Sequence, residues 1–266
     1  RVTRRKQGFR LEEGFDEKQL DDKLWEFLPS VNFTYSPTTK MNMRLAYSRA
    51  VIRPSFQERT AIPFYDPLAS ARIINASGVI STIVDNYDFK WEWFPGLGEI
   101  LSFGVYHKKF INPIERVGYR APEGSLDLYV ANSKQAILTG FEAEIRKSFG
   151  FIGQNPFLNK FFVSANFTFN DTKVTGYINR FGKDGQADTS TYKANRPMYG
   201  QTPWAYNLGF AYDGERLGLN MVQNAKGDQY MTVGYDYQDE KIQRPHSTTD
   251  AQLSYRFLKH KNFQVK

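Results

Sequence analysis

The sequence contains no cysteine and no long apolar run. Without cysteine, the chain has no disulfide framework, no thiolate zinc site and no cysteine nucleophile. No stretch approaches the ~18 consecutive apolar residues of a membrane-spanning helix. Glycine-rich phosphate-binding loops are also missing. The three histidines, His107, His246 and His260, lie far apart, and none has a second ligand at metal spacing. We therefore interpret them as isolated side chains and expect no metal site.

Aromatic and charged residues are abundant instead. Aromatics make up 16% of the 266 residues, with 16 Tyr and 22 Phe, which favours extensive β-sheet. The net charge is +7, but the basic residues are spread along the chain rather than gathered into one patch. This distribution argues against a nucleic-acid partner, and it fits a solvated protein face and loops near anionic lipid.

The stretch from Asn86 to Phe110 has the pattern of a β-hairpin. Its first limb alternates large aromatic residues with polar ones, and its second limb alternates Leu101, Phe103 and Val105 with Ser102, Gly104 and Tyr106. A period of two is typical of strands, and Pro95-Gly96-Leu97-Gly98 between the limbs predicts a tight turn. One face of this hairpin requires an apolar solvent, whereas the other carries full charges.

The same pattern recurs along the chain, and it predicts about nine complete strands. After a polar loop over residues 1–24, we expect strands at 27–35, 41–52, 86–94, 99–110, 132–149, 161–169, 204–212, 217–221 and 251–257, with a turn at 259–261 and a further strand starting near 262. Long loops are expected at 53–84, 114–128, 175–201 and 226–247. In this interpretation Asn112-Pro113-Ile114-Glu115 ends a strand, begins a loop and has no ligand role.

Short turns that alternate with long loops are typical of outer-membrane barrels, in which the short turns lie on the periplasmic side. Spans of about 9 to 11 residues also match tilted membrane strands. We therefore predict an all-β fold, a transmembrane antiparallel up-and-down β-barrel. Phe89, Trp91 and Trp93 would face lipid, with the Pro95–Gly98 turn at the periplasmic rim. A soluble β-rich binding protein is the alternative fold, and independence of detergent would favour it.

Several short motifs resemble the C-terminal barrel of TonB-dependent outer-membrane receptors, particularly the Bacteroidota type. They occur in the family's order and cover most of the chain from about Leu28 onward. The motifs are Tyr47-Ser48-Arg49 with Arg53-Pro54-Ser55-Phe56; Asn86-Tyr87-Asp88; Trp91-Glu92-Trp93-Phe94-Pro95; Gly98-Glu99-Ile100; Lys109-Phe110-Ile111-Asn112-Pro113-Ile114-Glu115; Gly140-Phe141-Glu142-Ala143-Glu144; Asn195-Arg196-Pro197; Gly200-Gln201-Thr202-Pro203; and Leu253-Ser254-Tyr255-Arg256-Phe257.

The resemblance implies a larger receptor. Such receptors carry an N-terminal plug domain and a TonB box, and their barrels close with about 22 strands. We expect residues 1–266 to be part of one C-terminal barrel domain of about nine or ten strands, with the plug domain and the final strands not present. An open sheet edge is not tolerated in lipid, which supports a partial chain.

The resemblance also implies a function: energy-coupled uptake of a nutrient such as an iron chelate, an oligosaccharide or a peptide, across the bacterial outer membrane. The implied partners are outer-membrane lipid, the receptor's own plug, the TonB system of the inner membrane and a surface lipoprotein. No enzyme activity and no cofactor are implied. A related barrel that serves adhesion, signalling or secretion is the alternative, and a plug and TonB box in the full-length sequence would distinguish the two.

Two sets of site residues follow. Cationic and aromatic residues of the long loops suit anionic chelates or sugar rings, although ordinary loop residues look the same: Arg53, Arg59, Tyr65, Arg72, Arg120, Tyr192, Tyr230, Tyr235 and Tyr237. Charged strand residues would face the lumen or the plug, or would simply form salt bridges along a solvated wall: Arg44, Lys90, Glu92, Glu142, Glu144 and Arg146. Paired-carboxylate catalysis by Glu142 and Glu144 lacks any accompanying nucleophile or histidine, so no catalytic residue is predicted.

Overall fold

The computed structural model describes residues 25–59, 62–67, 70–75, 79–120, 124, 126–153, 155–177, 196–234, 241–257 and 263–265. The polar loop expected over residues 1–24 and the turn expected at 259–261 lie outside the described residues. Within these ranges, no helix is long and apolar enough to cross a membrane.

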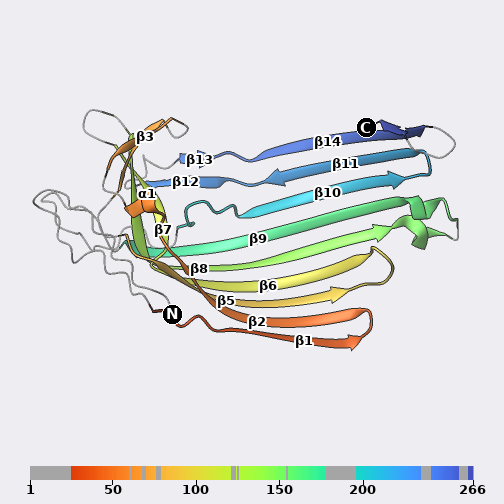
Figure 1. Ribbon diagram of the computed structural model, residues 1–266, viewed down its shortest axis with the longest axis horizontal. Coiled ribbons are helices and arrows are strands. Elements are labelled where there is room, and N and C mark those ends of the chain that lie inside the picture. The colour runs from red at the N-terminus through yellow and green to blue at the C-terminus, as the bar shows by residue number, and fades with distance from the viewer. Residues whose placement is uncertain are drawn as a thin grey trace, which may run out of the picture.

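The described strands form one sheet of 15 strands, in which each neighbour on a ten-strand main path pairs antiparallel. The path runs β1 (Ser30–Thr38), β2 (Met41–Ile52), β5 (Thr82–Trp93), β6 (Ile100–Ile111), β8 (Leu126–Ser148), β9 (Phe161–Tyr177), β10 (Trp204–Asp213), β11 (Leu217–Lys226), β14 (His246–Phe257) and β15 (Phe263–Val265). Over the described residues the sheet is open, and β1 and β15 are the two ends of this path (Figure 1). The expected all-β, up-and-down arrangement is confirmed.

The shorter elements lie mainly at one end of the long strands. They are α1 (Phe56–Arg59), β3 (Phe64–Asp66), β4 (Ala71–Asn75), β7 (Ile114–Arg120), β12 (Gln229–Gly234) and β13 (Lys241–Gln243). In Figure 1, α1, β3 and β7 lie at the left, and the short turns between long strands lie at the right. The longest of these turns joins β8 to β9 and contains the 3-10 helices η2 (Phe149–Ile152) and η3 (Leu158–Lys160).

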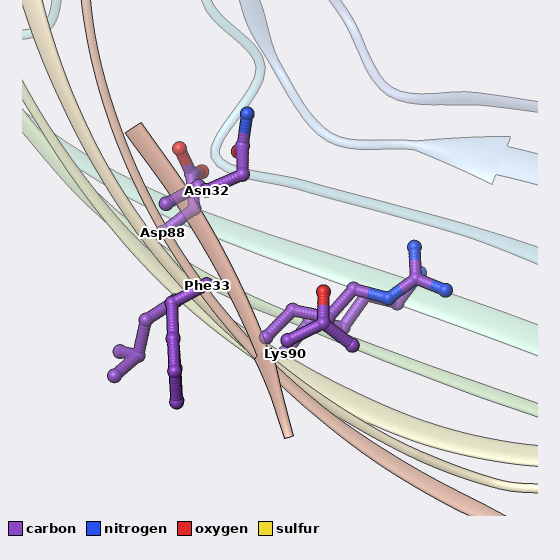
Figure 2. Close-up of a pocket in the computed structure, with 8 residues that line it drawn as sticks. Asn32, Phe33, Asp88 and Lys90 are labelled. Atoms are coloured by element: carbon purple, nitrogen blue, oxygen red, sulfur yellow. The ribbon is translucent and has the colours of Figure 1, made fainter. Parts of the chain in front are cut away.

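The main sheet has one apolar face and one polar face. Register aligns an apolar row across five strands: Leu45, Phe89, Val105, Phe141 and Phe169. One residue along each strand, register aligns a polar or small row: Arg44, Lys90, Gly104, Glu142 and Thr168. Figure 2 shows Phe33 pointing to the opposite side of the strands from Asn32 and Lys90. The apolar row is not covered by the described chain, since Leu45 is 55% exposed, so this face suits a lipid environment.

A buried carboxylate holds the turn between β5 and β6 against the end of β8. The Nζ of Lys147 lies 2.6 Å from an oxygen of Glu99, and the Oγ of Ser148 donates to the other oxygen at 2.6 Å. The hydrogen bonds from Lys147 and Ser148 lower the pKa of Glu99 below its ordinary value. Glu99 is therefore held as a carboxylate that ties two short turns together.

The strands of the main sheet occur where the sequence pattern predicts them, but β9, β11 and β14 are each about five or more residues longer than expected, and three of the long loops contain further strands. β2 has the predicted bounds, and β1 begins and ends three residues later than expected. Residues 114–128, predicted to be a loop, contain β7 and the start of β8. The connection expected at 53–84 contains α1, β3 and β4, and the one expected at 226–247 contains β12 and β13. These predictions were wrong because two of the connections form short hairpins, β3–β4 and β12–β13, and these pair in turn with β8 and β7.

Candidate functional site

At the end opposite the short turns, one long hairpin supplies the edges with which the other connections pair. β6 pairs Ile111 with Gln135, and β7 resumes with the same partner strand three residues later, pairing Ile114 with Asn132. β7 is therefore the continuation of β6 across Asn112-Pro113, where Asn112 has φ 54° and Pro113 has no N–H to donate. With the first residues of β8, it forms what we call the arm hairpin, which comprises residues 114–120 and 126–132.

Two strands from the other connections extend the arm hairpin by parallel pairing. β4 pairs with β8, placing Arg72 beside Asp127 and Asn75 beside Val130. β12 pairs with β7, placing Val233 beside Val117. Since β7 occupies one edge of β8, β4 must occupy the other edge, which pairs with β9 further down the strand.

The two connections therefore exchange sides. β4 arises between β2 and β5, on the β6 side of β8, and it joins the edge that β9 uses. β12 follows β11, on the β9 side of β8, and it joins the outer edge of β7, which continues β6. Together with residues 196–201, described below, these segments form an ordered structure that we call the loop cap.

Two apolar clusters pack inside the loop cap. Buried residues from the β4 region and the arm hairpin form the first: Ala71, Ile73, Val79, Leu128 and Val130, with Phe64 and Ile114 packed against them. Val117, Ala131 and Val233 form the second, with Tyr199 against them. Most of the buried hydrophobic residues belong to this cap rather than to the main sheet. The cap is therefore a packed unit and not a set of independent loops.

A buried ion pair fastens residues 196–201 to the arm hairpin. Arg196 donates from Nη1 to Glu115 at 2.9 Å and from Nη2 to the other carboxylate oxygen at 2.5 Å. Glu115 is fully buried and Arg196 is 6% exposed. The Oγ of Ser133 and the N–H of Tyr199 also donate to Glu115. The carboxylate therefore has the several partners that a buried charge requires.

The backbone continues this attachment. The N–H of Val174 in β9 donates to the carbonyl of Arg196 at 3.0 Å, and the N–H of Gly200 donates to Tyr230 of β12 at 2.8 Å. Residues 196–201 thus connect β9, β7 and β12. Glu115, expected at a loop boundary and without a ligand role, lies inside β7 instead. Its pairing with Arg196, from the motif Asn195-Arg196-Pro197, was not predicted, and the shared motif order was its only signal.

Asn132 plays a similar part beneath the other side of the cap. Its side chain accepts from the N–H of Ile80 at 2.9 Å and donates to the carbonyl of Ile80 at 2.9 Å, as a neighbouring strand would. It also donates to the carbonyl of Asn112 at 2.8 Å. Asn132 is fully buried, so it satisfies backbone groups that water cannot reach. The entry to β5 and the bend between β6 and β7 are fixed together.

The predicted loop residues take different positions in this cap. Arg53, Arg59 and Tyr65 are exposed, and Tyr65 is 65% exposed. Arg72 is also exposed, and it makes a two-bond contact with the buried Asp127, at 3.1 and 2.8 Å, which gives it a structural role. Tyr230 is half-buried in β12. Arg120 ends β7, but its side chain lies outside the described residues, as do Tyr192, Tyr235 and Tyr237.

The predicted strand residues come together on the polar face. Glu92 lies 3.1 Å from Arg44 and 3.7 Å from Lys90, which also lies 3.7 Å from Glu142. Lys90, Glu142 and Glu144 line a shallow hollow of about 310 Å³ together with Ser102, Asn166, Phe167 and Thr168. Lys90 and Arg44 also line a neighbouring hollow (Figure 2). Arg146 stacks over Phe162 at 5.8 Å.

Charge is distributed unevenly along one register row of this face. In β2, β5, β6 and β8, one register row contains Asn42, Glu92, Ser102 and Glu144. In the next strands the same row contains only uncharged side chains, Asn166, Asn207, Asn224 and Thr248. Asn207 donates to Asn166 at 2.6 Å. Among the described residues, no group of three or more acidic, histidine or cysteine side chains is placed to hold a metal ion.

Comparison with protein families matches residues 3–266 to the family described as TonB dependent receptor-like, beta-barrel. No curated protein sequence matches the chain. Solved structures with a similar fold include a mutant ferric enterobactin receptor from Pseudomonas aeruginosa in complex with enterobactin, at 15% identity and a TM-score of 0.54 over 87% of this chain. A siderophore receptor from Acinetobacter baumannii has 14% identity and a TM-score of 0.55 over 87% of this chain. The copper transporter OprC has 11% identity and a TM-score of 0.55 over 86%.

The chain spans about a third of these solved proteins, because the matches cover 33%, 35% and 31% of their lengths. At these identities, the likeness concerns the fold of the barrel.

Proposed function

Because the chain belongs to the TonB-dependent receptor β-barrel family, we propose that it forms the wall and the extracellular ligand-binding cap of an outer-membrane receptor for energy-coupled nutrient uptake. In this proposal, residues 1–266 are part of one barrel domain, and the receptor also contains a plug domain and depends on the TonB system. Proteins of the family are transporters rather than enzymes. The narrower assignment to the Bacteroidota type and the surface lipoprotein partner stay predictions of the sequence.

The observation that supports this proposal is that the long strands form a two-faced sheet along most of their length and a packed cap at one end. The main sheet presents an exposed apolar face and a charged face, which suits a wall between lipid and a water-filled lumen. At the end of the strands opposite the short turns, the loop cap is packed and ion-paired, so the exposed side chains on it have defined positions. A packed cap on a rigid wall is what a receptor needs to hold a ligand before import.

Within the cap, we propose that Arg53, Arg59 and Tyr65 contact the ligand, since they are exposed. Guanidinium and aromatic groups suit an anionic metal chelate, the face of a sugar ring or a peptide. Arg72 belongs to the frame through Asp127. On the wall, we propose that the charged strands β2, β5, β6 and β8 contact the plug. Lys90 and Glu142, which are paired with each other here, would then pair with charged groups of the plug.

The test uses the full-length receptor in its own bacterium. Cells with and without the receptor gene are supplied with iron chelates, copper, oligosaccharides and peptides, and depletion of each from the medium is measured with and without a protonophore. We expect one class to be depleted only by energised cells that contain the receptor. Ligand binding without energy-dependent depletion would instead favour a barrel for adhesion, signalling or secretion.

Point variants then examine the cap. Replacing Tyr65 with alanine should weaken binding of the identified ligand while the receptor keeps its normal abundance in the membrane. Replacing Arg72 with alanine should instead lower the amount of folded receptor, because Asp127 is 3% exposed and would lose its cation. Unchanged binding in the Tyr65 variant would remove this residue from the proposed site.

A further inference from the structure

The turn between β8 and β9, residues 149–160, exposes large apolar side chains. Phe151 is 66% exposed, Ile152 is 62% exposed and Phe157 is 49% exposed. Two other turns of the same end are shorter and more polar: residues 39–40 join β1 to β2, and residues 214–216 join β10 to β11. The β5–β6 turn exposes one large apolar side chain, Leu97. A cluster of exposed apolar residues on one turn is unusual enough to require a partner or a solvent that covers it.

The described residues of the turn, 149–153 and 155–160, have a defined backbone, so the exposure is built into the fold. The Oδ1 of Asn155 accepts from the N–H of Phe157 at 2.9 Å, and the carbonyl of Asn155 accepts from Leu158 at 3.0 Å. The N–H of Lys160 donates to Phe157 at 3.1 Å. Gly150 is packed so closely that an added Cβ would meet Asn159 at 1.7 Å. The apolar side chains are therefore held outward by a folded turn.

The aromatic rings of the turn are continuous with the apolar face of the sheet. The ring of Phe157 lies 5.2 Å from Phe161 and 5.9 Å from Tyr212, and the ring of Phe149 lies 6.4 Å from Phe210. Phe161 pairs with Tyr212, and Phe210 with Val163, so these residues share the face that holds the apolar row. The turn folds against the outer side of the wall and not across the polar face.

The charges around the turn suit anionic headgroups. No acidic residue occurs between Phe149 and Lys160. Lys147 precedes the turn, and its Nζ lies 5.6 Å from the ring centroid of Phe151, but this ammonium group is paired with Glu99. Lys160, which is half-buried, ends the turn. A lysine beside aromatic side chains is typical of the membrane interface, where the stem lies in the apolar layer and the ammonium group reaches the phosphates, and Lys160 has this position.

We propose that the turn of residues 149–160 is a lipid anchor, embedded in the interfacial layer of the membrane leaflet next to the short turns. Its occupant is the lipid itself, because its rings extend the lipid-facing wall without interruption. The inference rests on the proposed function in one respect, namely that the apolar face of the sheet meets lipid. The anchor would fix the depth of β8 and β9 in the membrane, at the end of β8 opposite the arm hairpin.

The test uses the full-length receptor reconstituted in phospholipid vesicles, with single nitroxide labels at Phe151→Cys, Leu97→Cys or Val105→Cys. This chain contains no native cysteine that would compete for the label. Leu97 is a matched apolar control on the β5–β6 turn, fully exposed, and Val105 reports on the wall. Power saturation measures the collision of each label with oxygen, which enters lipid, and with a water-soluble nickel chelate.

We expect the label at 105 to be accessible to oxygen and not to nickel, and the label at 97 to be accessible to nickel. The label at 151 should show a nickel accessibility several-fold below that at 97 while remaining accessible to oxygen. Nickel access at 151 equal to that at 97 would overturn the anchor alone. Shielding of 151 from both reagents would mean a protein partner and would also overturn it. Nickel access at 105 would contradict the assignment of the apolar face to lipid, and it would contradict the proposed function as well.

Discussion

At the residue scale, the contact between Glu115 and Arg196 shows how the loop cap gains a defined geometry. Removing two charges from water is costly, and the attraction between them offsets this cost only when every lone pair and N–H finds a partner. Here the carboxylate accepts from Arg196, Ser133 and the N–H of Tyr199. The pair therefore specifies which segments meet, joining residues 196–201 to β7 and β8.

Removing one partner of this pair should loosen the cap. Arg196→Met leaves Glu115 buried without its cation, and loss of one partner of a buried pair costs about 3 to 5 kcal/mol. We expect hydrogen exchange to speed up at the amides of Val174 and Tyr199, which bond to Arg196 and Glu115. The measurement is exchange by mass spectrometry on the full receptor in detergent.

The double variant Glu115→Met with Arg196→Met should recover much of the lost protection, because no uncompensated charge remains. Arg256→Met serves as the control: its bridge to Asp213 is exposed and 3.6 Å long, and such pairs contribute about 0 to 1 kcal/mol. Equal effects of Arg196→Met and Arg256→Met would show that the buried pair is not what holds residues 196–201.

At the element scale, the facing of β5 has a direct consequence for membrane assembly. Phe89 lies in the apolar row and Lys90 in the polar row. A cation on the lipid face of a barrel costs about 2 to 4 kcal/mol at the membrane midplane. Phe89→Lys should therefore reduce the amount of heat-resistant folded barrel in the membrane, whereas Asp88→Lys on the polar face should have little effect.

The measurement is the shift in gel mobility between unheated and boiled samples of the full receptor, which distinguishes folded from unfolded barrel. Trp91→Lys should behave like Phe89→Lys. Similar losses for Phe89→Lys and Asp88→Lys would contradict the assignment of the two faces.

The same elements show why part of the fold was predictable from sequence. β2 alternates Met41, Met43 and Leu45 with polar residues because each of its faces meets one environment, and its bounds follow from that pattern. In the arm hairpin, buried residues on both faces remove the alternation, as in the run Leu128-Tyr129-Val130-Ala131. β4 and β12 each have a local antiparallel partner, β3 and β13, but they join the cap through parallel pairing with the arm hairpin. Such pairing depends on residues far away in the sequence, which local patterns do not report.

The candidate site residues also fall into a part that a local sequence pattern predicts and a part that it does not. The lumen-facing set shares a face because a period of two places it there, so a sequence pattern suffices to group those residues. Arg72 was predicted among ligand contacts on the basis of its type and its place in a long connection. Its partner Asp127 lies 55 residues away and becomes a neighbour only through the β4–β8 pairing.

At the scale of the whole molecule, the crossing of the β2–β5 and β11–β14 connections makes the cap and the wall one structure. Each connection begins on one side of β8 and pairs on the other. Pulling either away would expose an apolar cluster and unpaired strand edges together, so the cap should move as a frame. For the proposed receptor, we therefore expect ligand passage to depend on the proposed plug and on the exposed segments, with the pairing of β7 and β12 kept throughout.

A disulfide across that pairing tests whether the frame stays closed during uptake. Val117 and Val233 are register partners and are both buried, and neighbouring strands lie about 4.8 Å apart, within the ~4.4 to 6.8 Å that a disulfide spans between Cα atoms. The full receptor with Val117→Cys and Val233→Cys should import its ligand equally well when oxidised and when reduced, because the bond joins segments that do not separate. Gel mobility under non-reducing conditions verifies the bond, and each single cysteine variant controls for the loss of a valine. Loss of uptake on oxidation, with recovery on reduction, would mean that β12 leaves the arm hairpin in every transport cycle and that the cap is a gate rather than a frame.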